Sequence, residues 1–276
     1  MILAVGFFDG VHLGHRAILS GAEAVLTFRT HPLETLAPER APRLIMSSED
    51  RVAALRASGV EDVIPLDFTP DFAALSAADF VRDCLLPRGV TAVRCGANWN
   101  FGAKGAGTPD TLKAFGIAAT LVPYAVYKGA PVSSTRIRAA ISAGAIEDAN
   151  AMLGAAWFVR GDMFAGKGLG RKLGFPTLNF RIPSFYVQPP RGVYAVRCGG
   201  AQAIANWGIA PTLGSAGWSQ SVLEVHFTEG LPSAFGDERI EILRFIRPEK
   251  TFPSLDALKR QIAADVVQVR KGTQGR

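Results

Sequence analysis

The chain has 276 residues, of which 48% are hydrophobic and 20% charged, a composition typical of a globular protein with a buried core. Its net charge of +6 favours anionic partners, but no basic run with interleaved aromatics indicates nucleic acid. Three cysteines without CxxC spacing argue against a disulfide framework or a zinc site, and no stretch of about 18 apolar residues could span a membrane. We therefore expect a cytoplasmic protein that acts on phosphorylated small molecules, with no nucleic-acid or membrane partner.

The first half of the chain alternates strand and helix patterns. Five apolar runs are typical of buried strands: residues 2–8, 24–28, 62–68, 91–96 and 117–124. Capped helical patterns lie between some of them, at residues 47–59 and 76–89. This alternation predicts βαβ units and therefore an α/β domain with a parallel sheet.

The first strand run leads into Asp9-Gly10-Val11-His12-Leu13-Gly14-His15, which holds two of the four histidines. A strand that enters a helix through such a turn presents backbone N–H groups and the positive end of the helix dipole there. His12 and His15 are three residues apart, so they would lie on nearly one face of the helix start. The motif predicts a site for an anion that gains charge during reaction, such as the phosphates of ATP. The alternative is two solvent-facing histidines in a turn.

Residues 131–138, PVSSTRIR, form a second candidate helix start. Ser133, Ser134 and Thr135 offer hydroxyls and N–H groups, and Arg138, one turn later, offers a fixed fork of donors for phosphate. By itself the segment favours a plain helix cap with a surface arginine. After the first motif, it favours a second part of the same nucleotide site.

After about residue 155 the pattern changes to short runs of β-branched and aromatic residues separated by Gly, Pro and Ser clusters. These runs predict a small antiparallel β-barrel. A closing helix over residues 254–271 is predicted by one apolar face: Leu255, Leu258, Ile262 and Val266. We expect two domains, residues 1–154 and 155–276.

A glycine-rich loop over residues 166–174 opens the candidate site of this second half. Its backbone amides, around Gly168, Gly170 and Lys172, can close over phosphates. The loop enters Phe175-Pro176-Thr177 rather than a helix, and no Gly-Lys-Ser/Thr follows, so it is neither a Rossmann fingerprint nor a Walker motif.

Thr177 and Asn179 follow this loop and are two residues apart, so on an extended strand their oxygens face one side. A hydroxyl and an amide carbonyl suit a Mg²⁺ ion that takes its other ligands from water and ATP phosphates. The alternative is a strand with two outward polar positions.

Glu224 lies in an otherwise apolar strand pattern over residues 221–227, on the same face as Val222 and His226. A carboxylate there is costly unless it has a partner. Phosphoryl transfer from ATP to a primary hydroxyl benefits from a base that orients or accepts the proton. The alternative is a solvent-side glutamate of an edge strand, and we expect His226 to be structural.

Motifs along nearly the whole chain resemble, in order, those of the bacterial bifunctional riboflavin kinase/FAD synthetases, whose N-terminal half belongs to the HxGH nucleotidyltransferases. The matching segments are GFFDGVHLGH, TFRTHP, GANWNFG, PVSSTRIR, GLGRKLGFPTLN, NWGIAPT, LEVHF and RPEKTF. Together, in the family's order, they make a chance match implausible.

The resemblance implies a Rossmann-like domain that adenylylates FMN to FAD and a barrel domain that phosphorylates riboflavin to FMN, both with ATP and Mg²⁺. It implies that Glu224 is the base of the kinase reaction. It also implies flavin contacts from Pro32, Asn98, Phe101, Phe175 and Arg247. The expected partners are ATP, riboflavin, FMN and FAD, and the expected assembly is a monomer or weak homo-oligomer.

Three features of the first half depart from the family's pattern. Phe7 stands where a polar or small residue is usual, Asn98 replaces an aspartate, and only about two helical turns fit between His15 and the second strand. One alternative is therefore a riboflavin kinase whose N-terminal domain only binds nucleotide or flavin. Another is a non-catalytic flavin-sensing or FMN-delivery protein, against which Thr177, Asn179 and Glu224 argue.

Overall fold

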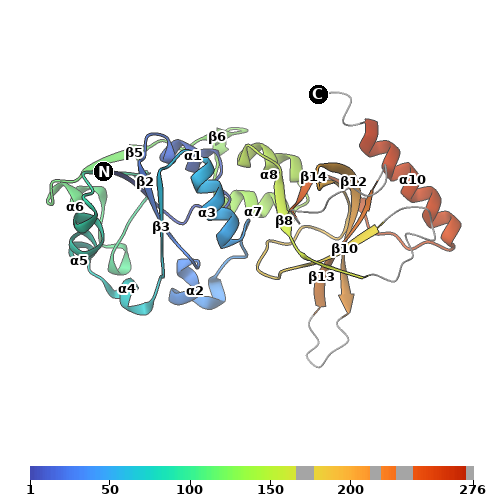
Figure 1. Ribbon diagram of the computed structural model, residues 1–276, viewed down its shortest axis with the longest axis horizontal. Helices are drawn as coiled ribbons and strands as arrows, with labels where there is room; N and C mark the ends of the chain where they lie inside the picture. The colour runs from blue at the N-terminus through green and yellow to red at the C-terminus, as the bar shows by residue number, and fades with distance from the viewer. Residues whose placement is uncertain (166–176, 212–218, 228–238, 272–276) are drawn as a thin grey trace. The chain divides into compact units, whose positions relative to one another are not determined.

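The computed structural model (Figure 1) describes residues 1–165, 177–211, 219–227 and 239–271. The chain divides into two compact units, Met1–Arg136 and Ile137–Arg276. Within the described ranges, no helix has both the length and the apolar character needed to cross a membrane.

The first unit is built on a parallel sheet of order β3-β2-β1-β4-β5. Its strands are β1 (Ile2–Val5), β2 (Ala24–Phe28), β3 (Asp62–Leu66), β4 (Ala92–Gly96) and β5 (Ala118–Val122). Each lies inside an apolar run that predicted it, and all neighbouring pairs are parallel, as expected. The strand order reverses between β1 and β4, and ligands of open α/β sheets bind at the carboxyl ends of strands at such a switch point. The end of β1 is where the first motif begins.

Helices cover both faces of this sheet. They are α1 (Leu13–Leu19), α2 (Pro32–Leu36), α3 (Ser48–Ala57), α4 (Pro70–Ala74), α5 (Ala77–Asp79) and α6 (Pro109–Lys113), with a short hairpin of β6 (Val126–Tyr127) and β7 (Ala130–Pro131) before the last segment. Apolar residues of α1 and α3 pack on one face, and those that follow α5, together with Leu112 of α6, pack on the other.

The helix expected over residues 76–89 is a short α-helix followed by a π-helical turn, Phe80–Leu85, and a 3₁₀ turn, Leu86–Arg88. Pro87 in that last turn has no N–H to continue a helix ladder.

The second unit begins with α7 (Ser134–Ser142), which starts just before the division, and α8 (Ile146–Leu153), followed by an antiparallel sheet of order β8-β14-β11-β12-β13-β10-β9. Its strands are β8 (Trp157–Arg160), β9 (Asp162–Phe164), β10 (Thr177–Ile182), β11 (Gly192–Cys198), β12 (Ala201–Pro211), β13 (Ser219–Phe227) and β14 (Arg239–Pro248). The two edge strands, β8 and β9, are separated only by Gly161, so the sheet must curl into a half-barrel. A Cβ at Gly161 would lie 2.6 Å from the carbonyl oxygen of Arg181, which explains the glycine at this bend.

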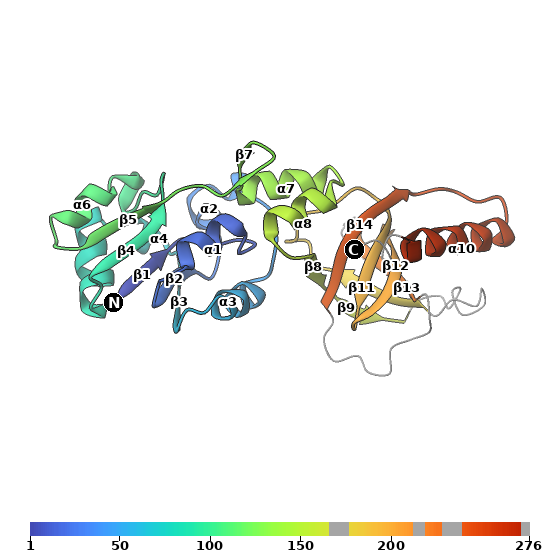
Figure 2. The ribbon, with the colours of Figure 1, turned by 90° about the horizontal axis from the view of Figure 1, so that it is seen from above.

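The last helix, α10 (Leu255–Lys271), packs against the half-barrel (Figure 2). Its buried residues Ile262, Val266 and Val269 join an apolar cluster on the sheet that includes Ile204. The predicted apolar face is wrong at its first position, because Leu255 is 56% exposed. This residue opens the helix and lies before the turn that reaches the sheet, which begins at Leu258.

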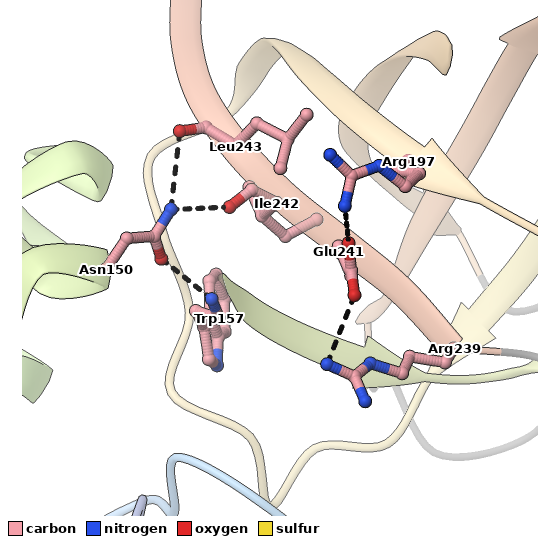
Figure 3. Close-up of polar contacts among 7 residues, drawn as sticks. All are labelled: Asn150, Trp157, Arg197, Arg239, Glu241, Ile242 and Leu243. Carbon is pink, nitrogen blue, oxygen red and sulfur yellow. Dashed lines mark hydrogen bonds and ion pairs between the residues drawn. The ribbon is translucent and has the colours of Figure 1, made fainter. Parts of the chain in front are cut away.

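Asn150 of α8 joins this helix to the half-barrel (Figure 3). Its side-chain oxygen accepts a hydrogen bond from the Trp157 backbone N–H at 2.7 Å, and its amide nitrogen donates to the carbonyls of Ile242 at 3.0 Å and Leu243 at 3.4 Å. One side chain thus satisfies backbone groups of β8 and β14 together. The domain boundary expected at residue 154 stays a prediction.

Replacing Asn150 by alanine should destabilise the second unit by about 1–3 kcal/mol, because the Trp157 N–H loses its acceptor in a half-buried place. Urea unfolding of the full chain measures this. Glu241→Gln is a control on the neighbouring stretch of β14. The Glu241 side chain is 18% exposed, and glutamine keeps an acceptor for its ion-pair partners Arg197 and Arg239, so we expect a smaller loss of stability than for Asn150→Ala. Equal unfolding curves for the Asn150 variant and the unmodified protein would contradict this role.

Candidate active sites

The turn that follows β1 has a strained backbone. Phe8, Gly10 and Val11 all have positive φ, at 59°, 86° and 39°. For residues other than glycine this conformation is costly, and it persists only where surrounding contacts determine it. Here Phe8 and Val11 are buried, and the edge of the Phe8 ring contacts His15 with 5.1 Å between ring centroids.

Asp9 is fully buried within this turn and holds it to two other segments. Its carboxylate accepts hydrogen bonds from the backbone N–H groups of Ile45, at 3.0 Å, and Met46, at 3.4 Å. Its backbone carbonyl accepts a hydrogen bond from the Ser134 hydroxyl at 2.9 Å. The first motif is therefore connected directly to the second, as a shared nucleotide site requires.

His12 and His15 form a stacked pair at the start of α1. Their ring centroids are 3.5 Å apart with 16° between the planes, which confirms that they share one face. His12 is the N-cap of α1, and its Nδ1 accepts a hydrogen bond from the His15 backbone N–H at 3.2 Å. A Cβ at Gly14 would lie 3.2 Å from the His12 ring, so the missing side chain makes room for that ring. The helix has seven residues, which confirms the short crossover.

The second motif begins α7. Ser133 Oγ accepts a hydrogen bond from the Arg136 backbone N–H at 3.2 Å and so caps the helix, while Ser134 bonds Asp9 as described. Thr135 is exposed, and Arg138, one turn beyond Ser134, is half-buried. The structure thus brings Ser134 to the first motif, and the phosphate contacts of these residues stay predictions.

The residues expected on the flavin side of this unit lie in two segments, at the start of α2 and after β4. Pro32 is the first residue of α2, whose N-cap is His31. The His31 ring contacts the Phe7 ring edge-on, with 4.7 Å between centroids. Asn98 is exposed, whereas Phe101 is buried in the core and stacks on Trp99 with 4.6 Å between centroids. Core packing accounts for Phe101, and its flavin contact stays a prediction.

The unusual Phe7 supports a buried cation. The Arg51 guanidinium lies 4.0 Å from the centroid of the Phe7 ring, and it also donates to the carbonyls of Phe28 and Arg29 at the end of β2. Burial lowers the pKa of Arg51, and the negative charge of Asp9 opposes this shift. An aromatic face compensates part of the cost of burying such a charge.

In the second unit the predicted kinase residues form one polar row on the sheet. Asn179 on β10 pairs directly with Glu224 on β13, which pairs in turn with Asn206 on β12. Thr177 pairs with His226, two residues along the same strands. Directly opposite residues lie on the same face with Cβ atoms about 4.5–5.5 Å apart, so these five side chains share one face. Glu224 is exposed there, which fits a base that must reach a substrate.

Residues at the ends of this row make further contacts. Thr177 Oγ1 and His226 Nδ1 are 3.0 Å apart, and burial lowers the pKa of His226 to about 4, so its ring is neutral at pH 7. The Asn206 amide donates to Glu249 at 3.4 Å. Arg247, expected at the flavin, forms an ion pair with the buried Asp265 of α10 at 2.7 Å, which gives it a role in docking that helix. Its flavin contact stays a prediction.

Four residues of the predicted kinase site lie outside the described residues: Gly168, Gly170 and Lys172, expected to bind ATP, and Phe175, expected to contact the flavin.

The sequence interpretation missed Asp9 and Asn206 and did not connect His226 to Thr177. A signal for Asp9 was available, because it is a lone carboxylate after an apolar strand, the argument that singled out Glu224. Asn206 follows an apolar run in the same way, but only the sheet register places it beside Glu224.

Comparison with known proteins finds a matching family for each half of the chain. The FAD synthetase family matches residues 1–136, and the riboflavin kinase family matches residues 153–273. The chain is 32% identical over 284 residues to the bifunctional riboflavin kinase/FMN adenylyltransferase of Bacillus subtilis (strain 168), a match that covers 96% of this chain and 90% of that protein. The chain belongs to the bifunctional riboflavin kinase/FMN adenylyltransferase family.

Other relatives of this family extend over the same length. The Escherichia coli (strain K12) protein of the same name is 34% identical over 291 residues, covering 98% of this chain and 92% of its own. A solved structure named as a macrolide-efflux protein from Streptococcus pneumoniae has a TM-score of 0.86 at 28% identity and covers 98% of this chain and 93% of that one. Both the expected fold class and the expected family are therefore confirmed.

Proposed function

We propose that the chain makes FMN from riboflavin in its C-terminal domain, residues 155–276, and FAD from FMN in its N-terminal domain, residues 1–154, using ATP in both reactions. Family membership supports both activities. The observation that carries the proposal is that each unit gathers its own polar set: the stacked histidines tied through Asp9 to Ser134, and the Asn179–Glu224–Asn206 row. A cytoplasmic location and a monomer or weak homo-oligomer remain predictions from the sequence.

In the kinase reaction, Glu224 orients the primary hydroxyl of riboflavin and accepts its proton as the oxygen attacks the γ-phosphorus of ATP, the bond to the β,γ-bridging oxygen breaks and ADP leaves. Thr177 and Asn179 fit a Mg²⁺ ion, because a hydroxyl and an amide oxygen on one face of β10 are hard donors that leave further positions to phosphate and water. A Mg²⁺ ion held there would supply positive charge against the ATP phosphates.

In the adenylylation reaction, a phosphate oxygen of FMN attacks the α-phosphorus of ATP and pyrophosphate leaves. The chain's task is to align these groups and to stabilise the charge that grows on the leaving phosphates. His12 and His15 would donate to that charge, while Ser133, Thr135 and Arg138 would hold the nucleotide from the start of α7. Asp9 contributes indirectly, because it fixes the turn that presents the histidines.

Thr177→Val and Asn179→Ala should each shift the Mg²⁺ dependence of FMN formation to higher concentration, because apolar side chains cannot replace oxygen ligands. The measurement is FMN production against Mg²⁺ concentration at fixed ATP. FAD formation from supplied FMN by the same variants is the internal control and should keep its Mg²⁺ dependence. Unchanged FMN curves in both variants would remove these residues from the metal site.

A further inference from the structure

We propose that His226 is a positioning residue of the kinase reaction, which accepts the hydrogen of the Thr177 hydroxyl and so directs the lone pairs of that oxygen toward the metal-bound nucleotide. This inference rests on the proposed role of Thr177 as a metal ligand.

The geometry places the two side chains side by side. Thr177 and His226 are directly opposed in the pairing of β10 with β13, and Thr177 Oγ1 lies 3.0 Å from His226 Nδ1. His226 also pairs with Ile204 on β12, so its strand is fixed on both sides. Ile204 belongs to the apolar cluster on which α10 packs. Support from packed neighbours of this kind is what a precisely oriented ligand needs.

The direction of the hydrogen bond decides what Thr177 can offer. A threonine hydroxyl has one hydrogen and two lone pairs. If Nδ1 of His226 accepts that hydrogen, this hydrogen bond takes neither lone pair of the threonine oxygen. If Nδ1 instead carries a hydrogen, it occupies one lone pair, so one fewer is available to a cation and the hydroxyl hydrogen needs another acceptor. Metal binding therefore favours the Nε2–H tautomer of His226.

The tautomer can be measured in the metal-free full-length protein. Long-range ¹H–¹⁵N correlation spectra distinguish a protonated from an unprotonated ring nitrogen, and single substitutions assign the signals because the chain has four histidines. We expect His226 with hydrogen on Nε2 and an Nδ1 whose chemical shift changes in Thr177→Val. An Nδ1–H tautomer, or an Nδ1 shift that ignores Thr177→Val, would overturn the inference.

A kinetic test separates this inference from the proposed metal site. In His226→Phe, the Mg²⁺ concentration for half-maximal FMN formation should rise about tenfold or more, the usual effect of losing a group that orients a metal ligand. His226→Gln, which keeps an acceptor, should recover part of this, and His226→Phe should add little to Thr177→Val. If Thr177→Val shifts the Mg²⁺ curve and His226→Phe does not, the inference fails and the metal site stands. If neither shifts it, both fail.

Discussion

FMN formation should fall at least about 10²-fold when Glu224 is replaced by glutamine, the scale expected for a lost general base. Glutamine has nearly the same shape and keeps a polar side chain beside Asn179 and Asn206, its direct neighbours in the sheet, but it cannot accept the proton of the substrate hydroxyl. Fold and ATP binding should therefore remain. The measurement is the rate of FMN formation from riboflavin at saturating ATP and Mg²⁺.

Two comparisons make this result specific. FAD formation from supplied FMN by the Glu224 variant should stay normal, because that reaction belongs to the other unit. Glu241→Gln, the same chemical change on β14 of the same sheet, should leave FMN formation unchanged. A kinase rate in the Glu224 variant close to that of the unmodified protein would remove this carboxylate from the mechanism.

Loss of both His12 and His15 should abolish FAD formation while FMN formation continues. Each imidazole would donate to a phosphate whose charge rises as pyrophosphate departs, and a preorganised donor of this kind contributes on the order of 10²–10³ in rate. The effect should fall mainly on turnover, because the interaction strengthens in the transition state. The measurement is FAD production from FMN with ATP, comparing kcat and KM.

The design must separate chemistry from helix stability, since His12 also caps α1. His12→Asn keeps an N-cap acceptor for the His15 N–H and removes only the imidazole. We therefore expect His12→Asn combined with His15→Ala to lose as much activity as the double alanine variant. Equal FAD production by these variants and the unmodified protein would mean that the histidines are not the phosphate site.

The short helix α1 does not leave these histidines loosely held. Contacts outside the helix help to hold the turn that carries the histidines. The buried Asp9 accepts hydrogen bonds there from Ile45, Met46 and Ser134. The packing of Phe8 against His15 adds to it. These contacts favour an active adenylyltransferase over the alternative of a domain that only binds nucleotide or flavin.

Strands β1 and β2 of the first sheet were predictable because strands buried on both faces leave continuous apolar runs, as 24–28 does for β2. The contacts that bring the site residues together were not predictable from the sequence. Asp9 meets Ile45 from 36 residues away and Ser134 from 125, and Thr177 meets His226 from 49, distances over which residue spacing carries no information. Local spacing correctly placed His12 beside His15, since those two lie on one helix start.

Residue types with two structural uses were the hardest to interpret. Arg247 can bind a flavin or dock a helix, and only the position of Asp265 on α10 shows the second use. Gly14 can open space for a ligand or for a neighbour, and the structure shows the His12 ring in that space. Leu255 fits the helical period of α10, yet it opens the helix before the turn that reaches the sheet.

The central claim, one chain with two consecutive activities, is tested most directly by incubating the purified protein with ATP, Mg²⁺ and riboflavin and following the flavins by chromatography. The account predicts that FMN forms first and FAD follows, and that supplied FMN is converted to FAD without riboflavin. Riboflavin that stays unchanged would contradict the kinase, and FMN that never becomes FAD, with oxidised or reduced flavin, would contradict the adenylyltransferase.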